Sequence, residues 1–140
     1  MIIDRLGELD EARVAAASHL FDEDVRSAAT GSFLSLDGHH LLFASIDGVD
    51  VGFVSGVETT HPDKGTEMFL YELGVDEAHR RKGVGRALVE ALARLARARG
   101  CRGMWVATEP GNKPAIATYR SAGATPPEAS VTLDWTFEPD

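Results

Sequence analysis

The chain has 140 residues, and its 14 lysine and arginine residues against 22 aspartate and glutamate residues give a formal net charge of −8 at pH 7. This length fits one domain over residues 1–140 with a sizeable core. A hydrophobic content of 44% beside 26% charged residues excludes wholesale disorder. The acidic balance argues against nucleic acid and against an anionic membrane as main partners, and it favours a cationic ligand.

The single cysteine, Cys101, excludes an intrachain disulfide and offers no zinc cluster. No pair of histidines has the spacing of a helical zinc site. The first residues lack the basic and then apolar pattern of a signal peptide. No stretch approaches the ~20 apolar residues that a membrane span needs. We therefore expect a soluble, cytoplasmic protein without a metal.

Apolar periodicity and turn residues divide the chain into strands and helices. In chain order the predicted elements are a strand over residues 1–6, helices over 8–20 and 25–36, strands over 40–46, 49–57 and 68–75, a helix over 84–99, a strand over 104–108, a helix over 112–122 and a strand over 131–137. This order, β-α-α-β-β-β-α-β-α-β, predicts an α/β fold with a mixed central sheet flanked by helices.

Three of these predictions have specific signals. Asp47-Gly48 between two apolar runs favours a tight hairpin, because both central positions of such a turn tolerate positive φ. The run over 68–75 is almost continuously apolar, as in a strand covered on both faces. Residues 131–137 alternate between apolar and polar side chains, which is typical of a strand covered on one face.

A basic turn with two glycines precedes the predicted helix over 84–99. Its sequence is Arg80-Arg81-Lys82-Gly83-Val84-Gly85-Arg86. The free N–H groups and the positive end of the helix dipole make an anion site, for which pyrophosphate is the natural guest. Residues 79–102 hold eight basic residues and one acidic residue, whereas the rest of the chain carries the acidic excess.

Other nucleotide-binding patterns fit this turn less well. A Walker A loop would end in Gly-Lys followed by Ser or Thr, which is absent here. A dinucleotide-binding fingerprint would need a third glycine where Leu88 stands and more βα units, although Glu109 lies where a ribose-binding acid would be sought. Taken alone, the two glycines also fit a simple turn beside a solvated basic face.

Two signatures occurring together make a more specific pattern. They are Arg80-x-x-Gly83-x-Gly85 and Asn112-x-x-Ala115-x-x-x-Tyr119-x-x-x-Gly123. The first resembles the coenzyme A pyrophosphate loop of the GNAT superfamily of N-acyltransferases, and the second resembles that superfamily's second signature. The predicted element order is similar to the GNAT fold over essentially the whole chain. Within the superfamily, the segments 69–83 and 131–134 look most like the aminoglycoside 3-N-acetyltransferases.

The resemblance implies acetyl-CoA as the cosubstrate and a homodimer as the assembly. It implies that the backbone N–H groups of Leu73 and Val75 bind the acetyl carbonyl and the pantetheine arm, and that Tyr119 protonates the sulfur of coenzyme A. Asn112 is either a coenzyme A contact or simply a helix cap. The candidate acetyl-CoA contacts are Leu73, Gly74, Val75, Arg80, Arg81, Lys82, Gly83, Val84, Gly85, Arg86, Asn112, Ala115 and Tyr119.

Glu72 is the candidate base, because it is the only charged residue between Met68 and Val75. A carboxylate in an apolar strand is costly without a partner, and a cationic amine in a site would supply one. The alternative is a strand acid that faces solvent or pairs with a core arginine. The matching acid in the aminoglycoside enzymes contacts the substrate amine, which favours the functional interpretation.

Further acids are candidates for binding a cationic amine, although an acidic run is often only a solvated face. These acids are Asp22, Glu23, Asp24, Glu109 and Asp134. Glu109 and Asp134 align with acids of the aminoglycoside enzymes. Asn112-Lys113 stands where the resemblance would place a further acid, and a lysine there weakens the capture of a polycation.

The leading hypothesis is acetyl transfer from acetyl-CoA to a primary amine of a small polycationic substrate, such as an aminoglycoside at its 3-N position, in a ternary complex. Another amine, for example a polyamine, a lysine side chain or a protein N-terminus, is the alternative within the same class. From a different class, the protein could be a non-catalytic acyl-CoA sensor, which would not need both Glu72 and Tyr119.

Overall fold

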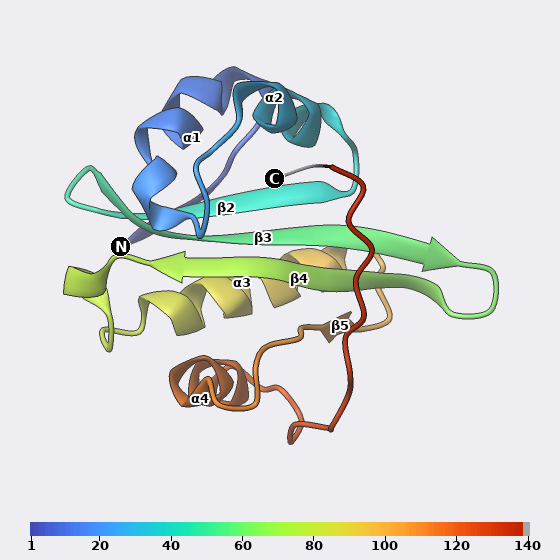
Figure 1. Ribbon diagram of the computed structural model, residues 1–140. Coiled ribbons are helices and arrows are strands. Elements are labelled where there is room, and N and C mark those ends of the chain that lie inside the picture. Colours follow the sequence, from blue (N-terminus) through green and yellow to red (C-terminus); the bar gives the residue numbers. More distant parts are fainter. Residues whose placement is uncertain (139–140) are drawn as a thin grey trace.

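The computed structural model describes residues 1–138, which build a five-stranded sheet with helices on both faces (Figure 1). The strands lie side by side in chain order: β1 (Ile2–Arg5), β2 (His39–Ile46), β3 (Val49–His61), β4 (Gly65–Val75) and β5 (Met104–Trp105). Neighbouring strands are antiparallel from β1 to β4, and β5 runs parallel to β4. The prediction of a mixed α/β sheet is confirmed.

Helices cover the two faces of the sheet unequally (Figure 1). One face carries α1 (Glu11–Ala16) and α2 (Ser27–Ser35), together with the 3₁₀ turns η1 (Glu8–Asp10) and η2 (Ser18–Leu20). The other face carries α3 (Val84–Ala98), which follows the 3₁₀ turn η3 (Glu77–His79) and contacts α4 (Lys113–Ser121). No helix within residues 1–138 is long and apolar enough to cross a membrane.

Each face has its own apolar core. Under α1 and α2, Leu20 packs with Phe43 and Phe53 of the sheet. Under α3, which confirms the helix predicted over 84–99, one apolar stripe faces the sheet, and its residues Val84, Leu88 and Leu92 are almost completely buried. The area-based gain of burying one such side chain is about 1.5–3 kcal/mol, so these two cores hold the strands that carry the site.

The predicted hairpin joins β2 and β3 as expected. Asp47 and Gly48 both adopt positive φ, 50° and 79°, which a two-residue turn between right-twisted strands requires. The turn fixes the register of the hairpin, with Phe43 opposite Phe53 in the α1/α2 core.

The predicted helix over 8–20 is broken, and this prediction was wrong in its continuity. The α-helical conformation ends at Ala17, with φ −102° and ψ 19°, and η2 follows directly. The break turns the chain so that Leu20 is buried and Phe21 stacks on Phe53 with ring centroids 3.9 Å apart. Packing on the sheet therefore overrides the helical periodicity of this segment.

Two strand predictions in the C-terminal half were also wrong. The strand expected over 104–108 has two residues, because β5 leaves the sheet after Trp105. The strand expected over 131–137 does not form within the described chain, since residues 122–138 contain no helix or strand. Alternation alone does not make a strand, because a strand needs an edge with which to pair. The expectation that β4 is covered on both faces fails at Tyr71, whose side chain is 68% exposed.

Candidate active site

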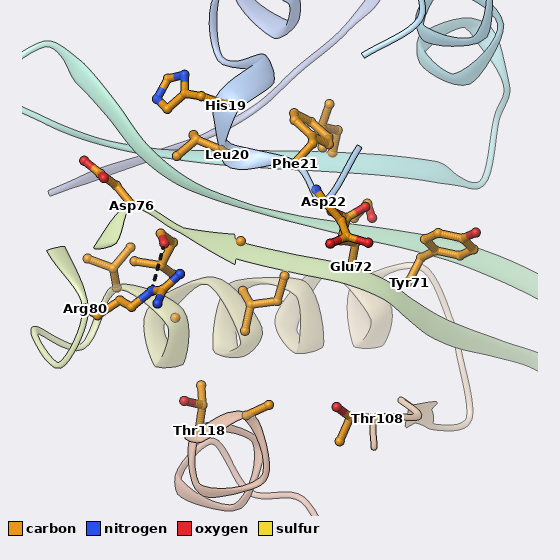
Figure 2. A pocket seen from close by; sticks show the side chains of 18 of the residues that line it. His19, Leu20, Phe21, Asp22, Tyr71, Glu72, Asp76, Arg80, Thr108 and Thr118 are labelled. Carbon is orange, nitrogen blue, oxygen red and sulfur yellow. Dashed lines mark hydrogen bonds between the residues drawn. The ribbon is translucent and has the colours of Figure 1, made fainter. Parts of the chain in front are cut away.

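A pocket of about 1920 Å³ lies along β4, between the α1–α2 connection on one side and the N-terminus of α3 with α4 on the other. Figure 2 shows its lining, with Asp22 and Glu72 on one side and Arg80 and Thr118 on the other. The pocket thus joins an acidic part of the molecule to a basic one.

The opening exists because β4 and β5 diverge. The two strands pair only at Met68 and Phe69, so the rest of this edge of β4 has no partner strand. The N–H of Asp76 donates to the carbonyl of Val51 on β3 at 2.8 Å. Because N–H groups alternate in direction along a strand, those of Leu73 and Val75 point away from β3, towards the pocket that both residues line. This orientation fits the main-chain role expected of them.

A bulge in β4 decides which way Glu72 faces. Ser55 on β3 pairs with Glu72, whereas Gly56 pairs with Leu70, so Tyr71 is an extra residue. One extra residue moves the side chains beyond it to the opposite face of a sheet. Leu70 belongs to the α3 core. Glu72 therefore lies on the α1/α2 face beside Ser55, and both residues line the pocket.

One backbone hydrogen bond holds the Glu72 carboxylate. The N–H of Asp22 donates to its Oε2 at 2.8 Å, and Figure 2 shows the two residues facing one another. The α1–α2 connection can come this close because residue 74 is glycine. A β-carbon on Gly74 would overlap the carbonyl oxygen of Leu20 and the ring of Phe53. The other oxygen of Glu72 accepts no hydrogen bond from residues 1–138 and remains available to a ligand.

Three further carboxylates line the pocket on the side of Glu72. Asp22, Glu23 and Asp24 are exposed there beside one cation, Arg26, so acids outnumber bases on this wall. Glu109 and Asp134 do not line the pocket. Their predicted roles in substrate binding therefore receive no support from their positions here.

The basic half begins at the turn before α3. Gly83 is the N-cap of α3 and adopts φ 81°, and Arg81 also has positive φ, 62°. No side chain caps this helix, so the N–H groups of its first turn have no intrahelical or capping partner. The Nε of Arg80 donates to the carbonyl of Val75 at 3.3 Å, which ties this cation to the end of β4. An uncapped helix N-terminus beside cationic side chains attracts phosphate oxygens.

Most of the basic turn reaches the pocket. Gly85 allows a close approach of α4, because a β-carbon there would lie 3.3 Å from Cγ2 of Thr118 and 3.7 Å from Leu73. Lys82 does not line the pocket. The predicted acetyl-CoA contacts that do line it are Leu73, Gly74, Val75, Arg80, Arg81, Gly83, Val84, Gly85, Arg86, Asn112, Ala115 and Tyr119.

Helix α4 and its N-cap contribute three of the predicted residues, Asn112, Ala115 and Tyr119. Oδ1 of Asn112 accepts the N–H of Ala115 at 3.2 Å, so Asn112 caps the helix as well as lining the pocket. Tyr119 lines the pocket while packing against the α3 core, and burial raises the pKa of its phenol. The phenol is therefore protonated at neutral pH and able to donate a proton.

Several lining residues carried no signal in the sequence. Ser55, Tyr71 and Thr108 reach the pocket only through the bulge and the divergence of β4 from β5, which a sequence pattern does not reveal. His19 reaches it through the break after α1. Residues 1–138 contain no group of three or more histidine, cysteine or acidic side chains placed to hold a metal.

The mixed sheet that opens at β4, beside an uncapped basic helix terminus, defines the GNAT fold. Residues 8–124 match the family described as Acetyltransferase (GNAT) family. The chain belongs to this family.

Solved structures share the fold over nearly the whole chain. An aminoglycoside acetyltransferase from an uncultured soil metagenomic sample, meta-AAC0020 in complex with sisomicin, is 20% identical with a TM-score of 0.84, covering 98% of this chain and 96% of that one. Aminoglycoside N-acetyltransferase AAC(6')-Iy in complex with CoA is 21% identical with a TM-score of 0.78, covering 96% of this chain and 99% of that one.

A curated relative matches a shorter stretch. The [ribosomal protein bS18]-alanine N-acetyltransferase of Escherichia coli strain K12 is 39% identical over 57 residues. This stretch is 41% of the present chain and 38% of the relative, so well under half of that protein is represented.

Proposed function

We propose that the protein transfers the acetyl group of acetyl-CoA to a primary amine of a cationic substrate. The observation that carries this proposal is that one pocket joins the basic N-terminus of α3 to the carboxylate of Glu72. The phosphates of coenzyme A match the positive charge of the basic half, and a cationic amine matches the negative charge of the acidic half. The CoA complex of AAC(6')-Iy supports the choice of cosubstrate.

The basic half would hold the phosphates of acetyl-CoA. The N–H groups of the first turn of α3 and the guanidinium groups of Arg80 and Arg81 are the donors that line this half. Charge-assisted hydrogen bonds to phosphate are about twice as strong as neutral ones. The N–H groups of Leu73 and Val75 are suited to the acetyl carbonyl and the pantetheine arm, because they point into the opening.

The chemistry needs two protons removed from the nitrogen and one supplied to the sulfur. The substrate ammonium gives a proton to Glu72, and the free amine attacks the thioester carbonyl carbon. The tetrahedral oxyanion that forms is stabilised by main-chain N–H donors. As the C–S bond breaks, the thiolate takes a proton from the Tyr119 phenol, and the second proton of the attacking nitrogen restores the phenol. Transfer is direct, because the pocket offers no activated nucleophile for an acetyl-enzyme.

A small polycation such as an aminoglycoside is our first candidate acceptor. The acidic wall of Asp22, Glu23, Asp24 and Glu72 suits several ammonium groups at once, and the fold is shared with a protein solved with sisomicin. The position acetylated stays a prediction: sequence resemblance suggests 3-N, whereas the solved neighbour whose name states a position is a 6' enzyme.

A protein N-terminus is the second candidate acceptor. The relative that acts on ribosomal protein bS18 alanine supports it, although the match spans 57 residues. An N-terminal α-amine presents one positive charge where an aminoglycoside presents several. Neutralising the outer acids should therefore affect the two substrates to different extents.

A thiol-release assay with acetyl-CoA separates these candidates. The panel contains an aminoglycoside, a polyamine and a peptide with an N-terminal alanine, each tested with the wild type and with Glu23→Gln/Asp24→Asn. We expect turnover of the aminoglycoside, with its KM raised about tenfold in the variant, as for the loss of one or two ionic contacts. If only the peptide is acetylated, the acceptor is a protein N-terminus and not an aminoglycoside. Tight acetyl-CoA binding without turnover of any amine would make the protein a sensor.

A further inference from the structure

Within residues 1–138, the buried polar side chains are those of His40 and Ser55, at 0% and 7% exposure. Both ring nitrogens of His40 have partners, since Arg5 donates to Nδ1 at 2.8 Å and Nε2 bonds to Glu58 at 2.6 Å. The Oγ of Ser55 forms no hydrogen bond with residues 1–138, and it is open to the pocket rather than sealed in the core. Because buried polar groups almost always have a hydrogen-bond partner, a molecule in the pocket must supply this one, either a water or a ligand that displaces it.

Ser55 lines the pocket from the sheet, beside the candidate base. Leu41 on β2 and Ser55 on β3 are cross-strand partners, and they are the residues that these two strands contribute to the lining. On its other side, Ser55 pairs with Glu72 on β4. Phe53, two residues earlier on β3, is completely buried in the α1/α2 core. The hydroxyl of Ser55 is therefore a polar group that an otherwise apolar stretch of the sheet presents to a ligand next to Glu72.

The pairing of Ser55 with Glu72 brings their side chains to one small region of the pocket. Directly opposite residues of antiparallel strands lie on the same face of the sheet, with β-carbons about 4.5–5.5 Å apart. The N–H of Asp22 occupies Oε2 of Glu72, as Figure 2 shows, and the other carboxylate oxygen is open to the pocket. A ligand nitrogen at this point can therefore contact the open oxygen of Glu72 and the Oγ of Ser55 together.

We propose that the Oγ of Ser55 accepts a hydrogen bond from the attacking nitrogen of the acceptor amine, while Glu72 takes the first proton of that nitrogen. This role rests on the proposed acetyl transfer and adds a second contact to the reacting atom. Once Glu72 has removed one proton, the bond to Ser55 holds one of the remaining N–H groups and so orients the lone pair. The nitrogen gains positive charge as it attacks the thioester carbon, so this hydrogen bond strengthens in the transition state. The hydroxyl keeps its own proton throughout.

Ser55→Ala removes the hydroxyl and keeps a small side chain, so it tests the contact in the thiol-release assay with the amine that the wild type acetylates fastest. We expect kcat at least about tenfold lower, as for a lost hydrogen bond to a charged group, with the KM for acetyl-CoA unchanged. Ser55→Thr keeps a hydroxyl on a side chain that suits a strand, and its kcat should lie closer to that of the wild type. Ser45→Ala is the matched control, because Ser45 lies on β2 outside the pocket, and it should keep kcat within about twofold. Circular dichroism checks that each variant is folded.

The outcomes for Ser55 and for the proposed reaction are distinguishable. A kcat of Ser55→Ala within about twofold of the wild type would overturn the role of Ser55 and leave the proposed acetyl transfer intact. A wild type that acetylates no amine of the panel would overturn both. A lower kcat in Ser55→Ala together with a raised KM for acetyl-CoA would also overturn the role of Ser55, because the substitution would then have disturbed the whole pocket.

A double variant separates contact with the reacting nitrogen from a packing effect. Residues that act on one atom give effects on kcat that do not add, whereas a packing defect lowers kcat by the same factor in any background. We therefore expect Ser55→Ala/Glu72→Gln to have a kcat within about threefold of Glu72→Gln alone. The same fold-loss from Ser55→Ala in the wild type and in Glu72→Gln would overturn the proposed contact.

Discussion

Two acidic side chains lie on neighbouring strands of one sheet, Glu58 on β3 and Glu72 on β4. Glu58 accepts a hydrogen bond from Nε2 of buried His40 at 2.6 Å and pairs with Arg99, and Arg99 also reaches Asp37 at 3.2 Å. Glu72 has one backbone donor and otherwise faces a pocket.

The difference shows what separates a structural acid from a candidate catalytic one. Burial works against the charge of Glu58, but the hydrogen bonds from His40 and Arg99 hold its pKa below the usual range. Both donors bind its Oε2, and the guanidinium of Arg99 balances its charge. Glu72 keeps acceptor capacity for a ligand, because the bulge turns it away from the α3 core. Glu58 has a cationic partner within the fold, whereas Glu72 lines an open pocket, and this difference distinguishes the two sites.

The turnover number kcat should depend on Glu72 and hardly at all on Glu58. We expect Glu72→Gln to lower kcat at least about 100-fold, because a base in this reaction contributes about 10²–10⁴. Its stability to urea should match that of the wild type, since the amide can still accept the N–H of Asp22. Glu58→Gln is the matched control and should keep kcat within about twofold below its melting range. A normal kcat in Glu72→Gln would remove Glu72 as the base.

The free energy of unfolding should depend on Glu58 and hardly at all on Glu72. We expect Glu58→Gln to lower the free energy of unfolding by about 2 kcal/mol, because buried His40 loses a charged partner. Urea denaturation followed by circular dichroism measures this difference. An unchanged midpoint in Glu58→Gln would show that the Glu58 cluster contributes little to folding.

Two substitutions of Asp22 isolate its backbone hydrogen bond to Glu72, because both remove the Asp22 carboxylate and only one removes the N–H. Asp22→Pro deletes the N–H, and the extended conformation of Phe21, with φ −86° and ψ 155°, suits a residue before proline. We expect kcat about fivefold lower than in Asp22→Asn, which keeps the N–H, as for the loss of about 1 kcal/mol. The KM for acetyl-CoA should be the same in both variants. Equal kcat values would mean that this bond does not position Glu72.

The pH dependence of stability should follow the Glu58 cluster. Burial, together with the charges of Arg5 and Arg99, lowers the pKa of His40 below 6.5 despite its bond to Glu58. The unfolded chain therefore binds this proton more tightly, and stability falls as the pH drops below 6.5. A second fall begins below pH 4.5, where the unfolded chain protonates Glu58 first. His40→Gln should remove the first fall and keep the second. Persistence of the first fall in this variant would assign it to another group.

The sequence predicted the acid of the site better than its surroundings. Glu72 stood out as one charge in an apolar run, and the turn at Gly83 stood out through its cations, because both are local features. Ser55 and Asp22 meet Glu72 only through a bulge and a close approach at Gly74, which depend on tertiary packing. The Glu58 cluster was missed for the same reason, since Arg99 lies 41 residues away along the chain.

The fold shows the same division. The hairpin at Asp47-Gly48 and the helix over 84–99 follow from turn chemistry and periodicity, and both are confirmed. The strand over 131–137 was predicted from its alternation, but no edge within the described chain pairs with it. Local pattern specifies which surface a segment can cover, and it does not specify which edge will receive it.

Calorimetric titration of acetyl-CoA tests most directly whether the two halves of the pocket have separate tasks. We expect one molecule bound per chain. Arg80→Ala/Arg81→Ala should weaken binding at least about tenfold, because charge-assisted contacts to phosphate are lost. Glu72→Gln should bind within about twofold of the wild type, because an uncharged isostere leaves the phosphate contacts intact. Binding that is unchanged in the arginine variant, or lost in Glu72→Gln, would contradict the division of the pocket into a coenzyme half and an amine half.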